Sequence, residues 1–153
     1  MQKLTRAALG MCLTIGLCGW AAASEPPSTG LGQAWPNAVD VSVSPHWHVY
    51  VFVLNGVKYI QVNDLNGNVI GAVATAGGQF ITLPVGEYSQ FVSTPQQHAA
   101  QMPAALPATA ATTVYKDNST VITATPTNSG VTMLQATAAD ICQDPEQCGG
   151  SAK

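Results

Sequence analysis

Charged side chains are scarce in this 153-residue sequence, because aspartate, glutamate, lysine and arginine together make up only 8% of it. The single arginine, Arg6, lies close to the N-terminus, and only three lysines follow it. Proteins that recognise nucleic acids contact phosphates and base edges with clusters of arginine and lysine. We therefore expect no nucleic acid partner, and little long-range electrostatic steering of any other partner.

Long apolar runs are also missing, apart from one at the N-terminus. Lys3 and Arg6 stand before the apolar stretch 7–20, and small residues follow at 21–24. A basic start, a short apolar centre and a small-residue end are typical of a secretory signal peptide. The stretch is shorter than the about 20 residues that a membrane-spanning helix requires. We expect residues 1–23 to form a signal helix that is cleaved, no integral membrane segment after cleavage, and a periplasmic or secreted protein.

Few cysteines remain once this leader is removed, because Cys12 and Cys18 belong to it. The remaining pair, Cys142 and Cys148, is predicted to form a disulfide, as an even cysteine count in an exported chain indicates. A loop this short stabilises the folded state by only about 2 to 2.5 kcal/mol in the chain-entropy model. We therefore expect a disulfide-looped tail at 138–153 that restrains the C-terminus and does not hold the fold together.

Motifs that carry enzyme chemistry are absent from the sequence. It has no Gly-x-Ser-x-Gly turn, no His-Glu-x-x-His pair and no glycine-rich phosphate loop. Its acidic residues are scattered near strand ends and turns, where carboxylates commonly accept hydrogen bonds from backbone amides. The sequence therefore predicts a protein that is not an enzyme.

The remaining chain has the composition of a β-sheet protein. Residues 24–37 are rich in proline, glycine and serine and are predicted to be a flexible lead-in. Residues 38–137 are predicted to form a single β-rich domain, interrupted by an alanine- and proline-rich connection at 99–111. After this connection, strands are expected at 112–116, 120–125 and 131–137. The predicted fold is all-β, an antiparallel meander that closes into a small sandwich or barrel.

Three dipeptides in the first half of the domain predict two-residue hairpin turns: Asn55-Gly56, Asn66-Gly67 and Gly77-Gly78. A turn at the first of them pairs Leu54 with Val57 and, at the other end, His48 with Asn63. Opposed residues share one face of a sheet. One face of this hairpin is aliphatic and is predicted to be core: Trp47, Val49, Val51, Val53, Ile60 and Val62. The other face carries His46, His48, Tyr50, Phe52, Tyr59, Gln61 and Asn63.

This second face allows two interpretations. The later turns place Ala72 beside Gln61 and Ala74 beside Tyr59, so that small residues lie next to large rings and leave a shallow recess. In the first interpretation the later strands cover the face. In the second it is an open binding face formed by Tyr50, Phe52, Tyr59, Gln61 and Asn63. The predicted function is a non-catalytic binding or structural role in the cell envelope or secreted space, with a protein or cell-wall partner there.

The histidines suggest an alternative function. Strand alternation puts His46 and His48 on one face, about 7 Å apart along the chain. Zinc and copper both accept imidazole ligands, so a periplasmic metal-binding protein is the alternative hypothesis. Such a site requires a third ligand, and His98 or Asp64 are the candidates. Without that ligand, the two histidines are simply the polar entry to a strand, and no cofactor is expected.

Overall fold

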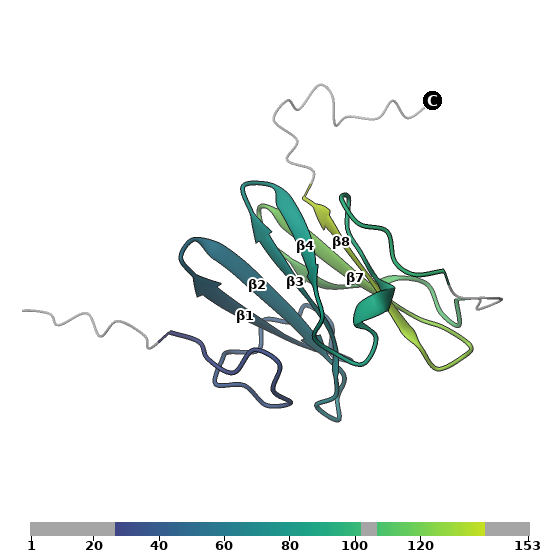
Figure 1. The fold of residues 1–153 in the computed structure, drawn as a ribbon. Helices are drawn as coiled ribbons and strands as arrows, with labels where there is room; N and C mark the ends of the chain where they lie inside the picture. Colours follow the sequence, from purple (N-terminus) through teal and green to yellow (C-terminus); the bar gives the residue numbers. More distant parts are fainter. Residues whose placement is uncertain (1–26, 102–106, 140–153) are drawn as a thin grey trace, which may run out of the picture.

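The computed structural model describes residues 27–101 and 107–139, so the predicted signal peptide and the Cys142–Cys148 pair lie outside the described residues. The described chain is nearly all β, which confirms the predicted class (Figure 1). Its elements are β1 (His48–Leu54), β2 (Val57–Asn63), β3 (Val69–Ala76), β4 (Gln79–Leu83), the short 3-10 helix η1 (Ser89–Phe91), β5 (Val92–Ser93), β6 (Thr112–Lys116), β7 (Thr120–Pro126) and β8 (Thr132–Ala138).

The strands form two four-stranded sheets, in the orders β1-β2-β3-β4 and β5-β8-β7-β6. The two sheets pack face to face as an open sandwich, so of the two predicted closures the structure has the sandwich and not the barrel. Every pair of neighbouring strands is antiparallel except β5 with β8, which run parallel. The meander prediction is therefore confirmed for β1 to β4 but does not hold at β5, where the chain crosses to the second sheet.

The predicted register of the first hairpin is confirmed from Leu54 opposite Val57 to His48 opposite Asn63. It continues as predicted into β3, where Ala72 lies opposite Gln61. The turn itself explains this accuracy, because Asn55 and Gly56 have φ values of 51° and 80°. Two consecutive positive φ angles are what a two-residue hairpin loop of this type requires.

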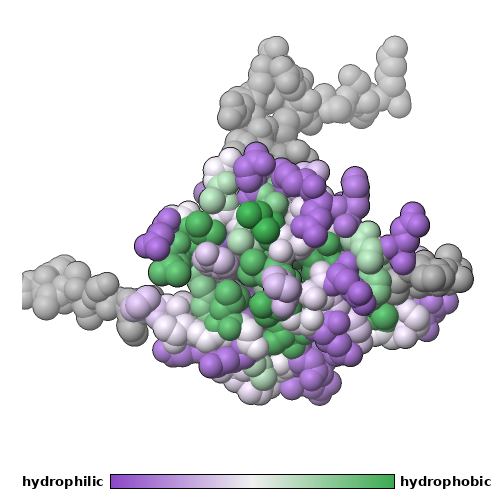
Figure 2. All heavy atoms as spheres, in the orientation of Figure 1, coloured by the Kyte–Doolittle hydropathy of each residue, from purple (hydrophilic) through white to green (hydrophobic). Residues whose placement is uncertain are grey.

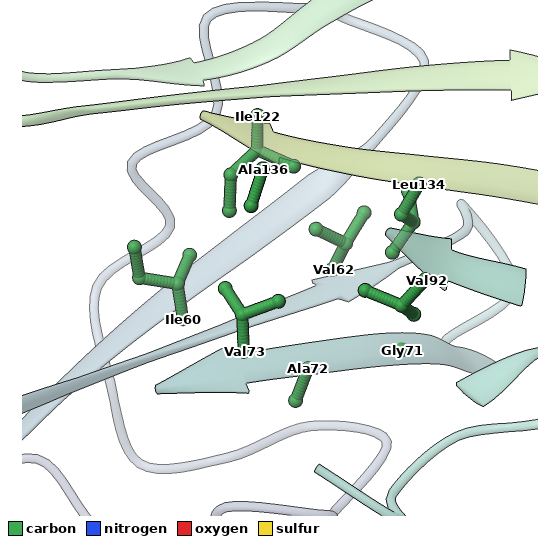
Figure 3. A pocket seen from close by; sticks show the side chains of 9 residues that line it. All are labelled: Ile60, Val62, Gly71, Ala72, Val73, Val92, Ile122, Leu134 and Ala136. Atoms are coloured by element: carbon green, nitrogen blue, oxygen red, sulfur yellow. The ribbon is translucent and has the colours of Figure 1, made fainter. Parts of the chain in front are cut away.

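The core lies between the two sheets, and Figure 3 shows part of it: Ile60, Val62, Gly71, Val73, Val92, Ile122, Leu134 and Ala136. These residues leave no room for a water molecule between them. Gly71 allows the sheets to approach, because a Cβ added to it would lie 2.7 Å from Val92 Cγ2. The predicted core face is confirmed for Val49, Ile60 and Val62, with Trp47 and Val51 packed against it.

Val53 is the exception on this predicted core face, since 65% of its surface is exposed. It lies at the end of β1, two residues before the hairpin turn and on an edge strand of the sheet. The prediction that Val53 is core was therefore wrong, because alternation alone does not show where the opposite sheet stops covering a strand.

The segment 29–44, which we call the N-terminal arm, packs against the sandwich. Thr29 and Asn37 pair across a turn, and Val41 N donates a hydrogen bond to Val49 O on β1, at 2.8 Å. Two residues further on, Val43 N donates to Val114 O on β6, at 2.9 Å. The arm therefore joins the edges of the two sheets, and the described part of the predicted flexible lead-in has defined contacts with the domain.

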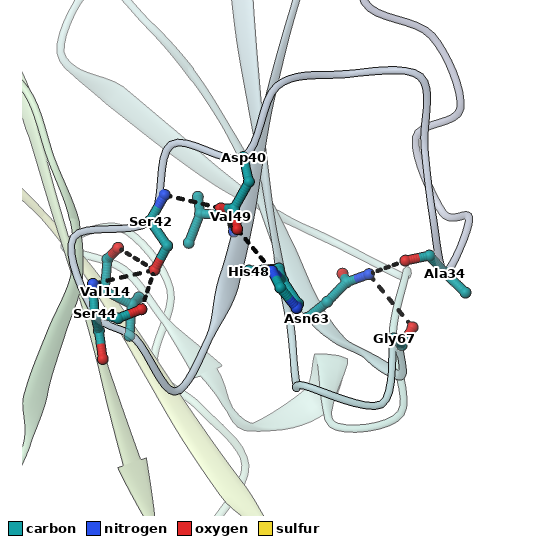
Figure 4. Close-up of polar contacts among 9 residues, drawn as sticks. All are labelled: Ala34, Asp40, Ser42, Ser44, His48, Val49, Asn63, Gly67 and Val114. Carbon is teal, nitrogen blue, oxygen red and sulfur yellow. Dashed lines mark hydrogen bonds and ion pairs between the residues drawn. The ribbon is translucent and has the colours of Figure 1, made fainter.

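Side chains of the arm accept hydrogen bonds from backbone amides of the arm itself. Asp40 Oδ1 accepts from Ser42 N at 2.9 Å, and Ser42 Oγ accepts from Ser44 N at 3.2 Å (Figure 4). Because these amides already have partners, this edge offers few free donors for a further strand.

Part of the alanine- and proline-rich connection is also described. Pro107 forms an isolated bridge with Thr127, and Ala108 N donates to Pro126 O at 2.9 Å. Residues 102–106 lie outside the described residues. The end of the connection thus lies against β7 before β6 begins at Thr112.

Candidate functional site

The predicted binding face is covered at one end by the N-terminal arm. Gln61 and Asn63 are fully buried there. Gln61 Oε1 accepts from Gly32 N at 2.6 Å, and Gln61 Nε2 donates to Gln33 O at 2.8 Å. Asn63 Nδ2 donates to Ala34 O at 2.7 Å. The expectation that the later strands cover this face was therefore wrong, because the covering segment comes from before β1.

Two aromatic residues of the predicted binding face are buried as well. Tyr50 and Phe52 are each only 5% exposed. Together with the two buried amides, they account for four of the five residues predicted to line an open recess. The open interpretation is therefore wrong for Tyr50, Phe52, Gln61 and Asn63, and only Tyr59 remains partly accessible.

The opposite end of the same face remains uncovered, and we call it the outer patch. The strand register places five apolar or aromatic residues there on one face of the sheet: Leu54, Val57, Tyr59, Ile81 and Leu83. Leu54 and Ile81 are both 62% exposed, and the other three are half-buried. Figure 2 shows hydrophobic side chains gathered on the face of the molecule over β1, β2 and β4. None of the five carries a charge, so the outer patch suits an apolar partner surface better than an ionic one.

His48 belongs to a second arrangement, at the start of β1. Its Nδ1 lies 2.6 Å from Asp40 Oδ2, and Asp40 Oδ1 accepts from Val49 N at 2.9 Å (Figure 4). Burial opposes ionisation of Asp40, but the hydrogen bonds from Val49, His48 and Ser42 outweigh it and hold its pKa below the ordinary value. The ionised carboxylate therefore fixes the orientation of the His48 ring.

Trp35 of the arm lies next to this histidine. The two ring centroids are 5.4 Å apart and the planes make an angle of 67°, an edge-to-face contact. The indole also lies against Gly67 in the β2–β3 turn, where an added Cβ would come within 2.8 Å of it. Despite these contacts Trp35 is 59% exposed. Sequence reasoning missed this residue, although a tryptophan inside a proline- and glycine-rich segment was a signal that the segment is not a simple linker.

The structure does not bring the three histidines together. His46 and His98 are exposed, and His98 follows Gln96 and Gln97, which hydrogen-bond to β4. β4 and β1 are opposite edges of the sheet, about 14 Å apart at the usual strand spacing. Within residues 27–101 and 107–139, no three histidine, cysteine, aspartate or glutamate side chains are grouped in a way that would hold a metal ion.

Asp64, the other candidate for a third metal ligand, serves the β2–β3 turn. Its Oδ1 accepts from Asn66 N and Asn68 N at 2.9 and 2.8 Å, and its Oδ2 accepts from Asn68 Nδ2 at 2.8 Å. Burial opposes ionisation, but these bonds from the two asparagines hold the pKa of Asp64 below its usual value. Its carboxylate thus supports the turn on which Trp35 rests.

A polar cluster connects the two sheets near the β1–β2 hairpin. Lys58 on β2 forms an ion pair with Asp117, in the β6–β7 turn, and Tyr115 Oη donates to Asp117 at 2.7 Å. Burial opposes ionisation of Asp117, but hydrogen bonds from Lys58, Ser119 and Tyr115 hold its pKa well below the ordinary range. Burial and the nearby carboxylate raise the pKa of Tyr115. The cluster has the chemistry of a structural link, with an ionised acid that is fully hydrogen-bonded.

No family model, no curated protein and no solved structure matches this chain. Across the described residues, no helix has the length and apolar character needed to cross a membrane. The outer patch and the Trp35–His48–Asp40 arrangement are therefore interpreted from their own chemistry.

Proposed function

We propose that the protein is an exported, non-catalytic binding domain of the cell envelope or secreted space, and that it holds a protein partner with the outer patch. The observation that supports this most is the uncharged, exposed sheet face between Leu54 and Ile81. Single exposed leucines are common on protein surfaces, but adjacent apolar residues on one sheet face are typical of interaction sites.

The covered half of the face supports the same proposal. The arm satisfies the buried amides of Gln61 and Asn63 at one end of the sheet, and its hydrogen bonds do not extend to the outer patch. The arm thus covers the polar end of the face, whereas the five apolar side chains of the outer patch stay exposed or half-buried. An apolar partner surface would remove the remaining five side chains from water, which is the main source of affinity in such contacts.

Placing a charged side chain on the outer patch tests this proposal. Ile81→Lys introduces a cation on the β4 side of the outer patch, and Leu65→Lys is the matched control because Leu65 is 52% exposed in the β2–β3 turn. The measurement is in vivo photo-crosslinking from Tyr59, replaced by a photoreactive phenylalanine analogue, with and without each substitution. We expect Ile81→Lys to reduce the cross-linked protein partner at least about tenfold and Leu65→Lys to leave it unchanged.

Circular dichroism and melting temperature establish whether both variants are folded. A folded Ile81→Lys protein that still forms the same cross-links at the same yield would refute the proposal. Absence of any cross-link in the parent protein would also refute it.

A copper or zinc site at His48 is the second candidate function. The observation that favours it is the bond from His48 Nδ1 to Asp40, because metal-ligating histidines commonly bond a carboxylate through the other ring nitrogen. His46 would be the second ligand, two residues earlier on the chain. The remaining ligands would have to come from water or from a substrate, since the described residues supply no third protein ligand.

A further inference from the structure

We propose that Trp35 and His48 form a second binding site, and that its ligand is a neutral oligosaccharide of pyranose rings. This site is separate from the outer patch. His48 begins β1 and Leu54 ends it, so the two surfaces are about 20 Å apart along the strand. The proposal does not depend on the proposed protein partner.

The first argument is that the indole is both exposed and held in place. Gly67 is buried under the ring, and the edge-to-face contact with His48 restrains it from a second direction. His48 itself is restrained by Asp40 and stacks on Tyr50, with ring centroids 6.3 Å apart. A ligand that stacks on a fixed ring does not have to pay for ordering it, so a restrained and exposed indole is well suited to binding.

The second argument is that hydrogen-bonding atoms beside the ring are unused. Neither Trp35 Nε1 nor His48 Nε2 has a hydrogen-bond partner among the described residues. An ionised carboxylate only accepts, so His48 Nδ1 donates the hydrogen bond to Asp40, and Nε2 is left to bond a hydroxyl group of a ligand. The site therefore offers the indole N–H of Trp35 and the Nε2 atom of His48 next to a flat apolar surface.

The third argument concerns charge. The described lysines, Lys58 and Lys116, lie at the other end of the sandwich, where Lys58 pairs with Asp117. No lysine or arginine of the described residues therefore stands beside Trp35 to bind a phosphate or a carboxylate, and the carboxylate of Asp40 is already engaged. A neutral ligand with an apolar face and hydroxyl groups at its rim matches this arrangement. A pyranose ring has both, because its axial C–H bonds form the face and its equatorial hydroxyls form the rim.

The experiment is an NMR titration of the full protein with cellotetraose and with the tetramer of N-acetylglucosamine, both neutral. The readouts are the indole N–H resonance of Trp35, assigned by its loss in Trp35→Leu, and the backbone amide resonance of Gly67 under the ring, from which Kd is measured in every variant. We expect this resonance to shift in a saturable way with at least one of the two sugars. Trp35→Leu, which keeps an apolar group against Gly67 but removes the flat ring, should raise Kd at least about tenfold.

Two further variants separate the site from its surroundings. His48→Phe keeps an aromatic ring beside Trp35 but removes the Nε2 atom that can hydrogen-bond a sugar hydroxyl, so we expect it to raise Kd severalfold. Leu65→Ala removes an exposed apolar side chain of the neighbouring turn and should leave Kd unchanged. Spectra of each variant show directly whether it remains folded.

Several outcomes would overturn the proposal. One is the absence of any shift at the Trp35 indole with either sugar at about 10 mM. At this concentration a site with a Kd of about 1 mM is about nine-tenths occupied. Another is binding that Trp35→Leu leaves unchanged. A decaproline peptide is the competing probe, because proline rings also stack on tryptophan. A shift with that peptide and not with the sugars would assign the site to proline-rich protein segments.

Discussion

The fully buried amide of Gln61 provides a direct test of the bond between the arm and the sheet. Gln61→Leu introduces an apolar side chain of similar size and removes three hydrogen bonds: from Gly32 N, to Gln33 O and to Asn63 Oδ1. The first two are bonds to the arm backbone. Without them, the arm loses its attachment to β2 over the segment where it crosses the sheet.

The expected magnitude follows from these contacts. Each hydrogen bond contributes about 0.5–1.5 kcal/mol net, so three contribute about 1.5–4.5 kcal/mol. The leucine side chain regains about 1 kcal/mol by burying apolar surface that the amide did not. We therefore expect Gln61→Leu to lower the free energy of unfolding by about 0.5–3.5 kcal/mol.

The measurement is urea unfolding, together with hydrogen exchange at the Gly32 amide. Exchange at Gly32 should become faster by a larger factor than exchange in β7, because the loss is local to the arm. Gln79→Leu is the matched control, because it makes the same chemical change at an exposed residue, the first of β4. It should change the free energy of unfolding by less than about 0.5 kcal/mol.

The reasoning would be refuted if Gln61→Leu were as stable as the parent protein and the Gly32 amide remained equally protected. That result would mean that the arm is held by contacts other than its bonds to Gln61.

Three further predictions concern other parts of the molecule. Folding lowers the pKa of Asp117, so its contribution to stability is complete above its unfolded pKa of about 3.9 and is lost as the pH falls toward its folded pKa. Asp117→Asn removes this contribution. The free energy of unfolding of the variant should therefore fall less steeply than that of the parent protein when the pH is lowered below about 4. Gly86→Ala should lower the free energy of unfolding by about 3 kcal/mol in chemical denaturation, because its Cβ would lie 2.6 Å from the backbone of Ile70 at a φ of 104°. Gly56→Ala is the control, at a φ of 80° with open space around it, and should lower it by about 1 kcal/mol. Equal losses of stability in the two variants would contradict this reasoning. A metal site at His46 and His48 predicts a rise in melting temperature with copper or zinc that His48→Ala abolishes, and metal-free protein from its native compartment with no such rise would end that hypothesis.

The strand pairing of the first sheet could be predicted from the sequence because its information is local. Two-residue turns such as Asn55-Gly56 set the register within a few residues, and alternation then assigns each side chain to a face. The same logic placed Ala74 beside Tyr59, as the structure shows. The parallel pairing of β5 with β8 has no such signal, since it joins residues about 40 positions apart without a turn between them.

The candidate sites were harder to predict for the same physical reason. The partners of Gln61 on the arm are 28 and 29 positions away, in a segment without periodicity. Whether a polar face is open or covered depends on such contacts, which composition does not reveal. His48 was identified by its spacing from His46, but its partner is Asp40 on the arm, and Trp35 became visible only once the arm was placed on the sheet.

The path of the arm has a consequence for the order in which the molecule can assemble. Ser42 Oγ donates to Val114 O across 72 positions of sequence, so this junction between the sheets forms only after β6 has been placed. Closing so long a loop is slow compared with forming hairpins such as β1–β2. The arm, although it precedes all eight described strands in the sequence, is therefore among the last segments to be fixed. A truncated chain that ends before Thr112 would retain the β1 hairpin but would have no site for the second half of the arm.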